Sequence, residues 1–162
     1  IGFFGFSTRH KGILDIIQAC KELGNVSLHL YSSIHHQGYD PYYYQDLRDA
    51  VDKCSWVELV TDFLSQEEIV HNLSKCDLNI WYTEPIQHYS TSGSIRQYLA
   101  AKRPIIAREN NMVSDLKDVI TIIPGYNKNA LIDALKNNNY TADHISEYVR
   151  EHTYSKIRTT YD

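Results

Sequence analysis

Residues 76–107 read CDLNIWYTEPIQHYSTSGSIRQYLAAKRPIIA, a stretch in which two apolar segments flank a polar loop and an amphipathic segment. Residues 76–82 and 104–107 have the composition of buried strands, and residues 92–101 have the spacing of a helix. Strands that are joined through a helix pair in parallel by a right-handed crossover. This stretch therefore predicts one unit of a parallel α/β sheet.

The same alternation of strand and helix continues in both directions along the chain. Further strands are expected at residues 1–6, 26–31, 56–60 and 119–123. Helices are expected at residues 13–23, 45–53, 66–73, 129–136 and 141–161, with a short helical turn at 112–116. We predict an α/β, Rossmann-like three-layer sandwich with a mainly parallel sheet of about six strands. Residues 1–162 are expected to form this single domain.

The amino-acid composition excludes several classes of protein and of binding partner. The 162 residues are 43% hydrophobic and 22% charged, which excludes a disordered or fibrous chain, and the net charge of −4 argues against a nucleic-acid partner. No apolar run is long enough to span a bilayer and no signal peptide is visible, so we expect a cytoplasmic protein. Cys20, Cys54 and Cys76 are expected to be buried, reduced thiols. Because the chain opens directly in a strand, we expect a domain cut from a longer protein.

The loop after the first strand, residues 7–12, carries basic side chains at the start of a helix. Ligands of open parallel sheets bind at the carboxyl ends of the strands. A helix amino terminus together with Arg9 and Lys11 would attract phosphate oxygens. The alternative is an ordinary solvated basic loop, since neither a Walker motif nor a GxGxxG fingerprint is present.

A second candidate loop, residues 89–94 (YSTSGS), leads directly into the expected helix at 92–101. Its hydroxyl groups and the close backbone approach that Gly93 permits favour binding of an oxyanion. The alternative is a helix capped by serine in the usual way. Arg96, just inside the helix, would supply either a bidentate contact or a surface salt bridge.

Other polar and aromatic residues carry weaker predictions. His35 and His36 are adjacent, which favours solvated side chains over a metal site, and no metal is predicted. Tyr39 and Tyr42–Tyr44 are expected to cover the sheet edge rather than to stack on a ligand.

Together these motifs resemble a known family. Gly5 followed after five residues by Lys11–Gly12, and the run SerThrSerGlySerIleArgGlnTyrLeuAlaAlaLysArgProIleIleAla at 90–107, are similar to the carboxy-terminal, donor-binding domain of a GT-B glycosyltransferase. The resemblance is greatest to enzymes of the family-4 type. The segments 65–68, 76–80 and 152–157 stand in the order that this family shows, so the resemblance covers essentially the whole chain.

The resemblance implies a donor site for a nucleotide-diphosphate sugar. Lys11 and Arg9 would pair with the diphosphate, which the amides of Ser92, Gly93 and Ser94 would also bind. Gln97 would bind the ribose, and Asp62 and Phe63 would lie at the base. No cofactor is implied beyond the donor substrate. The acceptor, a glycan, lipid or small molecule, would be bound by a missing amino-terminal domain, the only part through which a membrane surface could be contacted.

Three positions depart from the family pattern. Phe6 stands where the family usually has arginine, so Arg9 would have to substitute for it. Tyr89 and Gln97 stand where the family has two glutamates, so Glu84 is either a displaced acid or a solvated loop carboxylate. The expected activity is retaining hexosyl transfer that the isolated domain cannot perform. The alternative is a non-catalytic α/β nucleotide-binding or interaction domain that kept the fold but lost transfer.

Overall fold

The computed structural model describes residues 1–34, 39–85, 92–125, 128–137 and 140–152. Its centre is a six-stranded sheet in the order β3-β2-β1-β4-β5-β6, and every neighbouring pair is parallel. The strands are β1 Gly2–Phe4, β2 Leu28–Tyr31, β3 Val57–Val60, β4 Asn79–Trp81, β5 Ile105–Arg108 and β6 Thr121–Ile123. The predicted parallel sheet of about six strands is confirmed.

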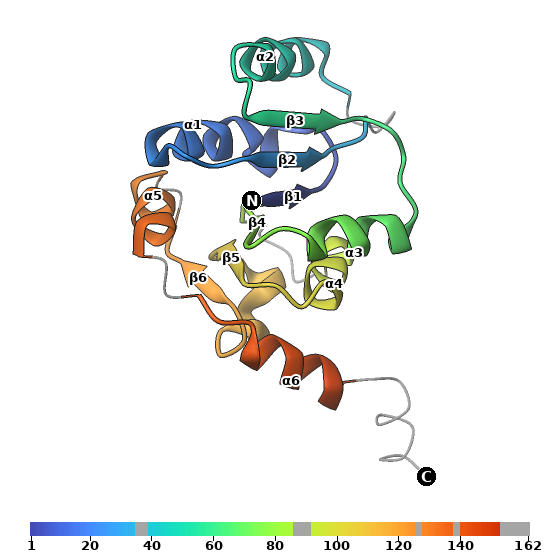
Figure 1. Cartoon of the computed structure of the whole chain (residues 1–162), viewed down its shortest axis with the longest axis vertical. Coiled ribbons are helices and arrows are strands. Elements are labelled where there is room, and N and C mark those ends of the chain that lie inside the picture. Colours follow the sequence, from blue (N-terminus) through green and yellow to red (C-terminus); the bar gives the residue numbers. More distant parts are fainter. Residues whose placement is uncertain (35–38, 86–91, 126–127, 138–139, 153–162) are drawn as a thin grey trace.

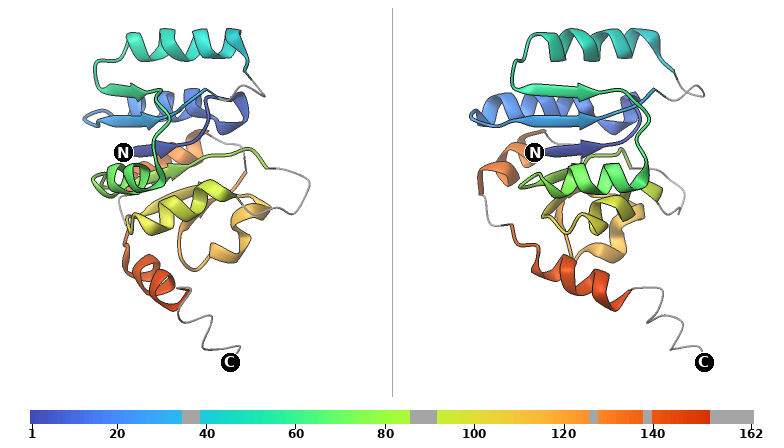
Figure 2. Two further views of the ribbon diagram at one scale, coloured as in Figure 1. Left: turned by 90° about the vertical axis from the view of Figure 1, so that its right-hand side faces the viewer. Right: turned by 45° about the vertical axis from the view of Figure 1, so that its right-hand side comes forward.

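Helices cover both faces of this sheet. They are α1 Ile13–Leu23, α2 Pro41–Asp52, α3 Gln66–Ser74, α4 Gly93–Ala100, α5 Lys128–Asn137 and α6 Asp143–Glu151, with 3₁₀ turns η1 Arg9–Lys11 and η2 Asn111–Leu116. Figures 1 and 2 show α1 and α5 on one face and α3 and α4 on the other. One apolar core lies on each face, which gives the predicted three-layer, Rossmann-like α/β sandwich.

The strand order reverses between β1 and β4: β2 and β3 are added on one side of this pair, and β5 and β6 on the other. The two strands pair only at Gly2 and Asn79. Beyond that point the hydroxyl of Tyr98 fills the gap: it accepts from the Phe4 amide at 2.6 Å and lies 2.9 and 3.0 Å from the carbonyl oxygens of Phe4 and Ile80. Helix α4 is thereby anchored to the two strands whose exit loops carry the predicted site.

Helix α2 begins four residues earlier than expected, at Pro41 rather than at Gln45. Asp40 caps it, accepting hydrogen bonds from the amides of Tyr42 and Tyr43, and Pro41 favours the first helical turn. The tyrosine run is therefore helical and not a loop. Tyr43 is buried, whereas Tyr42 is 82% exposed, so only part of the run covers its neighbours as predicted.

The structure also bears on the predictions for the end of the chain and for the cysteines. Helix α6 ends at Glu151, while residues 153–162, which we expected to continue it, lie outside the described part of the chain. All three cysteines are buried and outside any disulfide. Over the residues that the structure describes, no helix combines the length and apolar character that crossing a membrane requires.

Candidate functional site

The two predicted loops meet at one cavity of about 690 Å³. Lys11, from the loop after β1, and Ser92, Gly93, Ser94 and Gln97, from the start of α4, all contribute to its lining. The cavity opens where the strand order reverses, at the carboxyl ends of β1 and β4. The structure thus brings together residues from two loops that are about eighty positions apart in the sequence.

Lys11 is placed by the short turn η1 and by Gly12 after it. Gly12 has φ +62°, and a Cβ there would lie 2.6 Å from the ring of Tyr82. Glycine is therefore required where the turn packs against the exit of β4. The Lys11 Nζ donates to the Thr83 hydroxyl at 3.2 Å, and burial lowers the pKa of this ammonium. A partly desolvated cation beside an open cavity favours an anionic ligand.

Glu84 lies in the loop after β4, behind this turn. Its amide donates to the carbonyl of His10 at 2.8 Å, and the side chain of Asn110 donates to the Glu84 carbonyl at 2.8 Å. Glu84 is half-buried but does not line the cavity that contains Lys11. Burial, with a further contribution from Lys11, lowers the pKa of His10, and Glu84 partly opposes this shift. The structure therefore places Glu84 beside the turn and not at the cavity wall.

The amino terminus of α4 faces the cavity without a capping side chain from the described residues. Ser92 occupies the N-cap position, but its hydroxyl makes a 2.9 Å hydrogen bond with that of Ser94 instead of with a backbone amide. The Trp81 indole donates to the Ser94 hydroxyl at 3.0 Å. A Cβ at Gly93 would meet nothing within 4 Å among the described residues, so the backbone is open on that side of the first turn. Such a terminus attracts anions.

Gln97, predicted to bind ribose, is folded back on its own helix. With its amide nitrogen turned toward the available acceptors, it donates to the carbonyls of Gly93 at 2.6 Å and Ser94 at 3.0 Å. Gln97 lines the cavity, and its amide oxygen keeps the capacity to accept a hydrogen bond. Tyr89, the other position at which the family resemblance expects glutamate, lies outside the described residues, as do Ser90 and Thr91.

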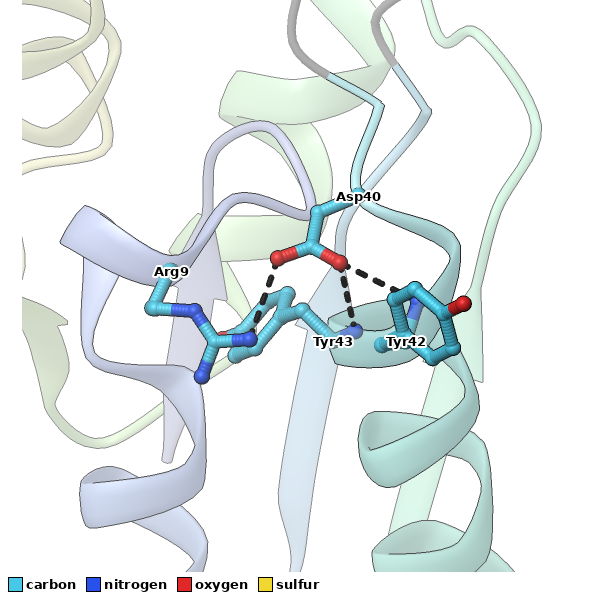
Figure 3. A network of polar contacts seen from close by, with 4 residues as sticks. All are labelled: Arg9, Asp40, Tyr42 and Tyr43. Carbon is cyan, nitrogen blue, oxygen red and sulfur yellow. Dashed lines mark hydrogen bonds and ion pairs between the residues drawn. The ribbon is translucent and has the colours of Figure 1, made fainter.

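Arg9 is not among the residues that line the cavity. Figure 3 shows its guanidinium paired with the carboxylate of Asp40, at 3.0 Å. The same guanidinium lies 5.1 Å from the centre of the Tyr43 ring. The Asp40 carboxylate also accepts from the amides of Tyr42 and Tyr43, and these hydrogen bonds, with Arg9, lower the pKa of Asp40. Arg9 thus joins η1 to the start of α2. The predicted histidine pair, His35 and His36, is outside the described residues.

Asp62 and Phe63 line a second, smaller cavity of about 90 Å³. Phe4 and Phe6 line both this cavity and the larger one, so the two are neighbours. Phe63 is 84% exposed and so belongs to neither apolar core. An elongated ligand could therefore extend from Lys11 past two aromatic side chains to Phe63.

Sequence reasoning missed several residues of the site. Gln66 lines the larger cavity because Ser65 caps α3 there, in a capping box with Glu68. Thr83 contacts Lys11, and Asn110 fixes the loop behind it. The Ser-x-x-Glu spacing at the start of α3 was a usable signal, whereas the contacts of Thr83 and Asn110 depend on how separate loops pack.

A still larger cavity, about 820 Å³, lies elsewhere. It is bordered by Ile1, Ser27, Leu78 and Pro104, which directly precede β1, β2, β4 and β5. It therefore reaches the amino ends of the strands, where open parallel sheets do not usually bind ligands. Over the residues that the structure describes, no group of three or more histidine, cysteine, aspartate or glutamate side chains could hold a metal ion.

By sequence, the chain matches no protein-family model and no curated protein. By structure, it is similar to sucrose-phosphate synthase from Thermosynechococcus elongatus, with a TM-score of 0.79 and 15% identity, over 99% of this chain and 43% of that one. The UDP-forming α,α-trehalose-phosphate synthase of Burkholderia vietnamiensis has a TM-score of 0.77 and 10% identity, over 99% and 43% of the two chains. Anabaena HepE, in complex with UDP and glucose, has a TM-score of 0.76 and 14% identity, over 99% and 47%.

The chain has the fold of one GT-B glycosyltransferase domain. It spans less than half the length of each of these GT-B proteins. At such low identity the likeness concerns the fold, and the role of the cavity has to be argued from its own residues.

Proposed function

We propose that this chain is the carboxy-terminal, donor-binding domain of a GT-B glycosyltransferase, and that it binds a nucleoside diphosphate sugar. The observation that carries the proposal is the shared cavity, in which a partly buried ammonium faces a helix amino terminus at the reversal of the strand order. The solved structures of HepE with UDP and glucose and with UDP-glucose support UDP as the nucleotide.

The cavity suits a diphosphate for electrostatic reasons. Lys11 offers a cation that has lost part of its hydration, and the first amides of α4 offer hydrogen-bond donors with a positive end of the helix dipole. In glycosyl transfer, negative charge grows on the departing diphosphate while positive charge develops on the sugar. Fixed donors at the diphosphate would stabilise that transition state, and no side-chain nucleophile is needed.

The rest of the nucleotide fits along the neighbouring cavity. The ribose would lie near the amide oxygen of Gln97, and the base would extend past Phe4 and Phe6 toward Asp62 and Phe63. Phe63 is exposed and can stack on a base. This placement uses the two cavities that the structure brings side by side.

The finer parts of the proposal concern the reaction. We expect retaining hexosyl transfer of the family-4 type, with the acceptor, whether glycan, lipid or small molecule, bound by a part of the protein outside this chain. A membrane surface would be contacted only through that part. Glu84 is the candidate acid on the family resemblance alone; its backbone lies beside the turn that carries Lys11, and its side chain is not part of the described cavity lining.

Isothermal titration calorimetry tests the proposal. UDP, GDP, ADP and UDP-glucose are titrated into the wild-type chain, into Lys11→Gln and into Lys21→Gln, an exposed lysine on α1 that serves as the control. We expect saturable binding of one diphosphate nucleotide, weakened about tenfold or more by Lys11→Gln and unchanged by Lys21→Gln. Absence of binding with every nucleotide, or binding indifferent to Lys11→Gln, would contradict the proposal.

One observation favours the alternative of a binding domain without transfer activity. Position 97 holds a neutral amide that is engaged with its own helix, where the family resemblance expects a carboxylate. Transfer by the complete protein separates the two functions. Release of UDP from UDP-glucose in the presence of acceptors supports the enzyme, whereas tight nucleotide binding without any turnover supports the binding domain.

A further inference from the structure

Three cationic side chains lie in or near the cavity of about 690 Å³ that Lys11 lines. Lys11 and Arg96 line it, one from the loop after β1 and the other from the first turns of α4. Arg9 lies on the same short turn as Lys11 but outside the lining. Arg9 is nearer to Lys11 in the sequence, but the contacts of each arginine decide which of them acts together with Lys11.

Arg9 is engaged on the far side of its turn. Its guanidinium pairs with Asp40 at 3.0 Å and lies over the ring of Tyr43, as Figure 3 shows. Asp40 in turn caps α2 through two backbone amides. Moving Arg9 into the cavity would break the ion pair and the ring contact together, and would leave the capping carboxylate without its cation.

Arg96 has no such engagement. Its side chain is exposed, and within the described ranges it forms no ion pair with an acidic side chain. On its other side is a groove that contains Asp115 and Tyr148, but Asp115 lies beyond ion-pair distance of Arg96. The described lining of the larger cavity contains no carboxylate that would neutralise Arg96 from within.

We propose that Arg96, rather than Arg9, is the second cation of the diphosphate site. The inference rests on the proposed function and assigns a residue that the family pattern does not, since the usual arginine position holds Phe6. The two phosphates of a nucleotide sugar carry one negative charge each, which the side chains of Lys11 and Arg96 balance. The planar guanidinium can donate two parallel hydrogen bonds to phosphate oxygens. Its position on α4 places it beside the helix amides that face the same anion.

The test compares three arginines by calorimetry with UDP and with uridine. Arg96→Gln should weaken UDP binding about tenfold, the effect of losing a charge-assisted hydrogen bond, and leave uridine binding unchanged. Arg9→Gln should weaken UDP binding clearly less than Arg96→Gln. Arg48→Gln, which changes an exposed arginine on α2 far from the cavity, is the matched control and should behave as wild type.

Two further measurements separate a binding role from a structural one. The salt dependence of UDP affinity should be shallower for Arg96→Gln than for wild type, because one interacting charge is lost, while the melting temperature stays the same. Arg96→Lys keeps the charge and should recover part of the affinity. If Arg96 instead stabilises the fold at the groove that contains Asp115, then Arg96→Gln and Asp115→Asn will lower the melting temperature by similar amounts. Both variants will then leave the affinity for UDP unchanged.

The possible outcomes distinguish the two proposals. UDP binding that depends on Lys11 but not on Arg96, or that falls more with Arg9→Gln than with Arg96→Gln, overturns this inference and leaves the proposed function standing. A wild-type chain that binds no diphosphate nucleotide overturns both.

Discussion

Lys11 combines a cost in stability with the proposed role in binding. Its ammonium is partly buried, and burial lowers its pKa because the charged form loses hydration. A lysine whose pKa is lower in the folded chain than in the unfolded chain destabilises the fold while it is charged. This penalty is present at neutral pH and disappears as the pH rises above the folded pKa. A bound anion would offset it.

Replacement of Lys11 by methionine should therefore stabilise the unliganded chain and also weaken its binding of nucleotide. We expect the melting temperature of Lys11→Met to rise by roughly 1–4 °C in the absence of nucleotide, the change that about 1 kcal/mol produces in a chain of this size. Lys21→Met, on the exposed side of α1, is the control and should change neither property. A clear fall in the melting temperature of Lys11→Met would show that the ammonium stabilises the unliganded fold.

Gly12 is the residue on which the position of Lys11 depends. Gly12→Ala forces a side chain into the left-handed region and to 2.6 Å from the Tyr82 ring, whereas Gly125→Ala meets a similar φ of +58° with open space around it. We expect Gly125→Ala to cost about 1 kcal/mol, the strain of the backbone alone, and Gly12→Ala to cost at least about 2 kcal/mol. Urea unfolding measures both. Equal losses would mean that the contact with Tyr82 is unimportant.

At the scale of elements, the hydroxyl of Tyr98 links α4 to the two central strands β1 and β4. Tyr98→Phe would remove the partner of the Phe4 amide and a donor to the carbonyls of Phe4 and Ile80, all at the divergence of β1 and β4. We expect a loss of about 2–4 kcal/mol in the free energy of unfolding, since buried backbone groups lose their partner. Tyr42→Phe, at an exposed tyrosine, should change it little. A small effect of Tyr98→Phe would show that water satisfies these groups.

The junction between η1 and α2 should be sensitive to acid. Asp40 has a pKa below its unfolded value of 3.8, because amides of α2 and Arg9 favour the carboxylate. Its stabilisation is therefore complete above the unfolded pKa and is lost as the pH falls through the folded pKa. Asp40→Asn keeps the cap but removes the ion pair. Its melting temperature should lie below that of wild type at neutral pH and converge with it in acid, whereas Asp46→Asn, exposed on the same helix, should stay close to wild type throughout.

The sequence predicts the elements of this fold better than the contacts between them. Apolar runs located the strands, because the sheet is covered on both faces, and apolar periodicity located most helices, because each helix buries one side. The start of α2 was missed because its tyrosines hide the helical period, although Asp40–Pro41 is itself a start signal. The ion pair of Arg9 with Asp40 joins residues 31 positions apart and follows only from the packing of two loops. Lys11 and Gly93 line one cavity because the strand order brings their loops to the same place on the sheet.

At the scale of the whole molecule, exposed apolar side chains gather at the edge that carries the site. Among the described residues, the large hydrophobic side chains that remain exposed are Phe6, Ile34, Tyr39, Tyr42 and Phe63. They follow β1, β2 and β3, at the carboxyl ends of the strands. Exposed apolar side chains gathered at one edge are typical of a surface that another domain or protein covers.

The proposed function predicts that the isolated chain binds donor without transferring sugar. Incubated with UDP-glucose and candidate acceptors, it is expected to release no UDP above the uncatalysed background, because the acceptor would be held by the part of the protein outside this chain. The complete protein is the positive control. Steady turnover by the isolated chain would show that both substrates bind within these residues.

The most direct measurement is a crystal structure of the chain with UDP. We predict that the diphosphate lies within hydrogen-bond distance of the Lys11 Nζ and of the backbone amides of Gly93 and Ser94, with the base directed toward Phe63. A diphosphate found away from this cavity, or a nucleotide that leaves Lys11 and the start of α4 uncontacted, would contradict the account.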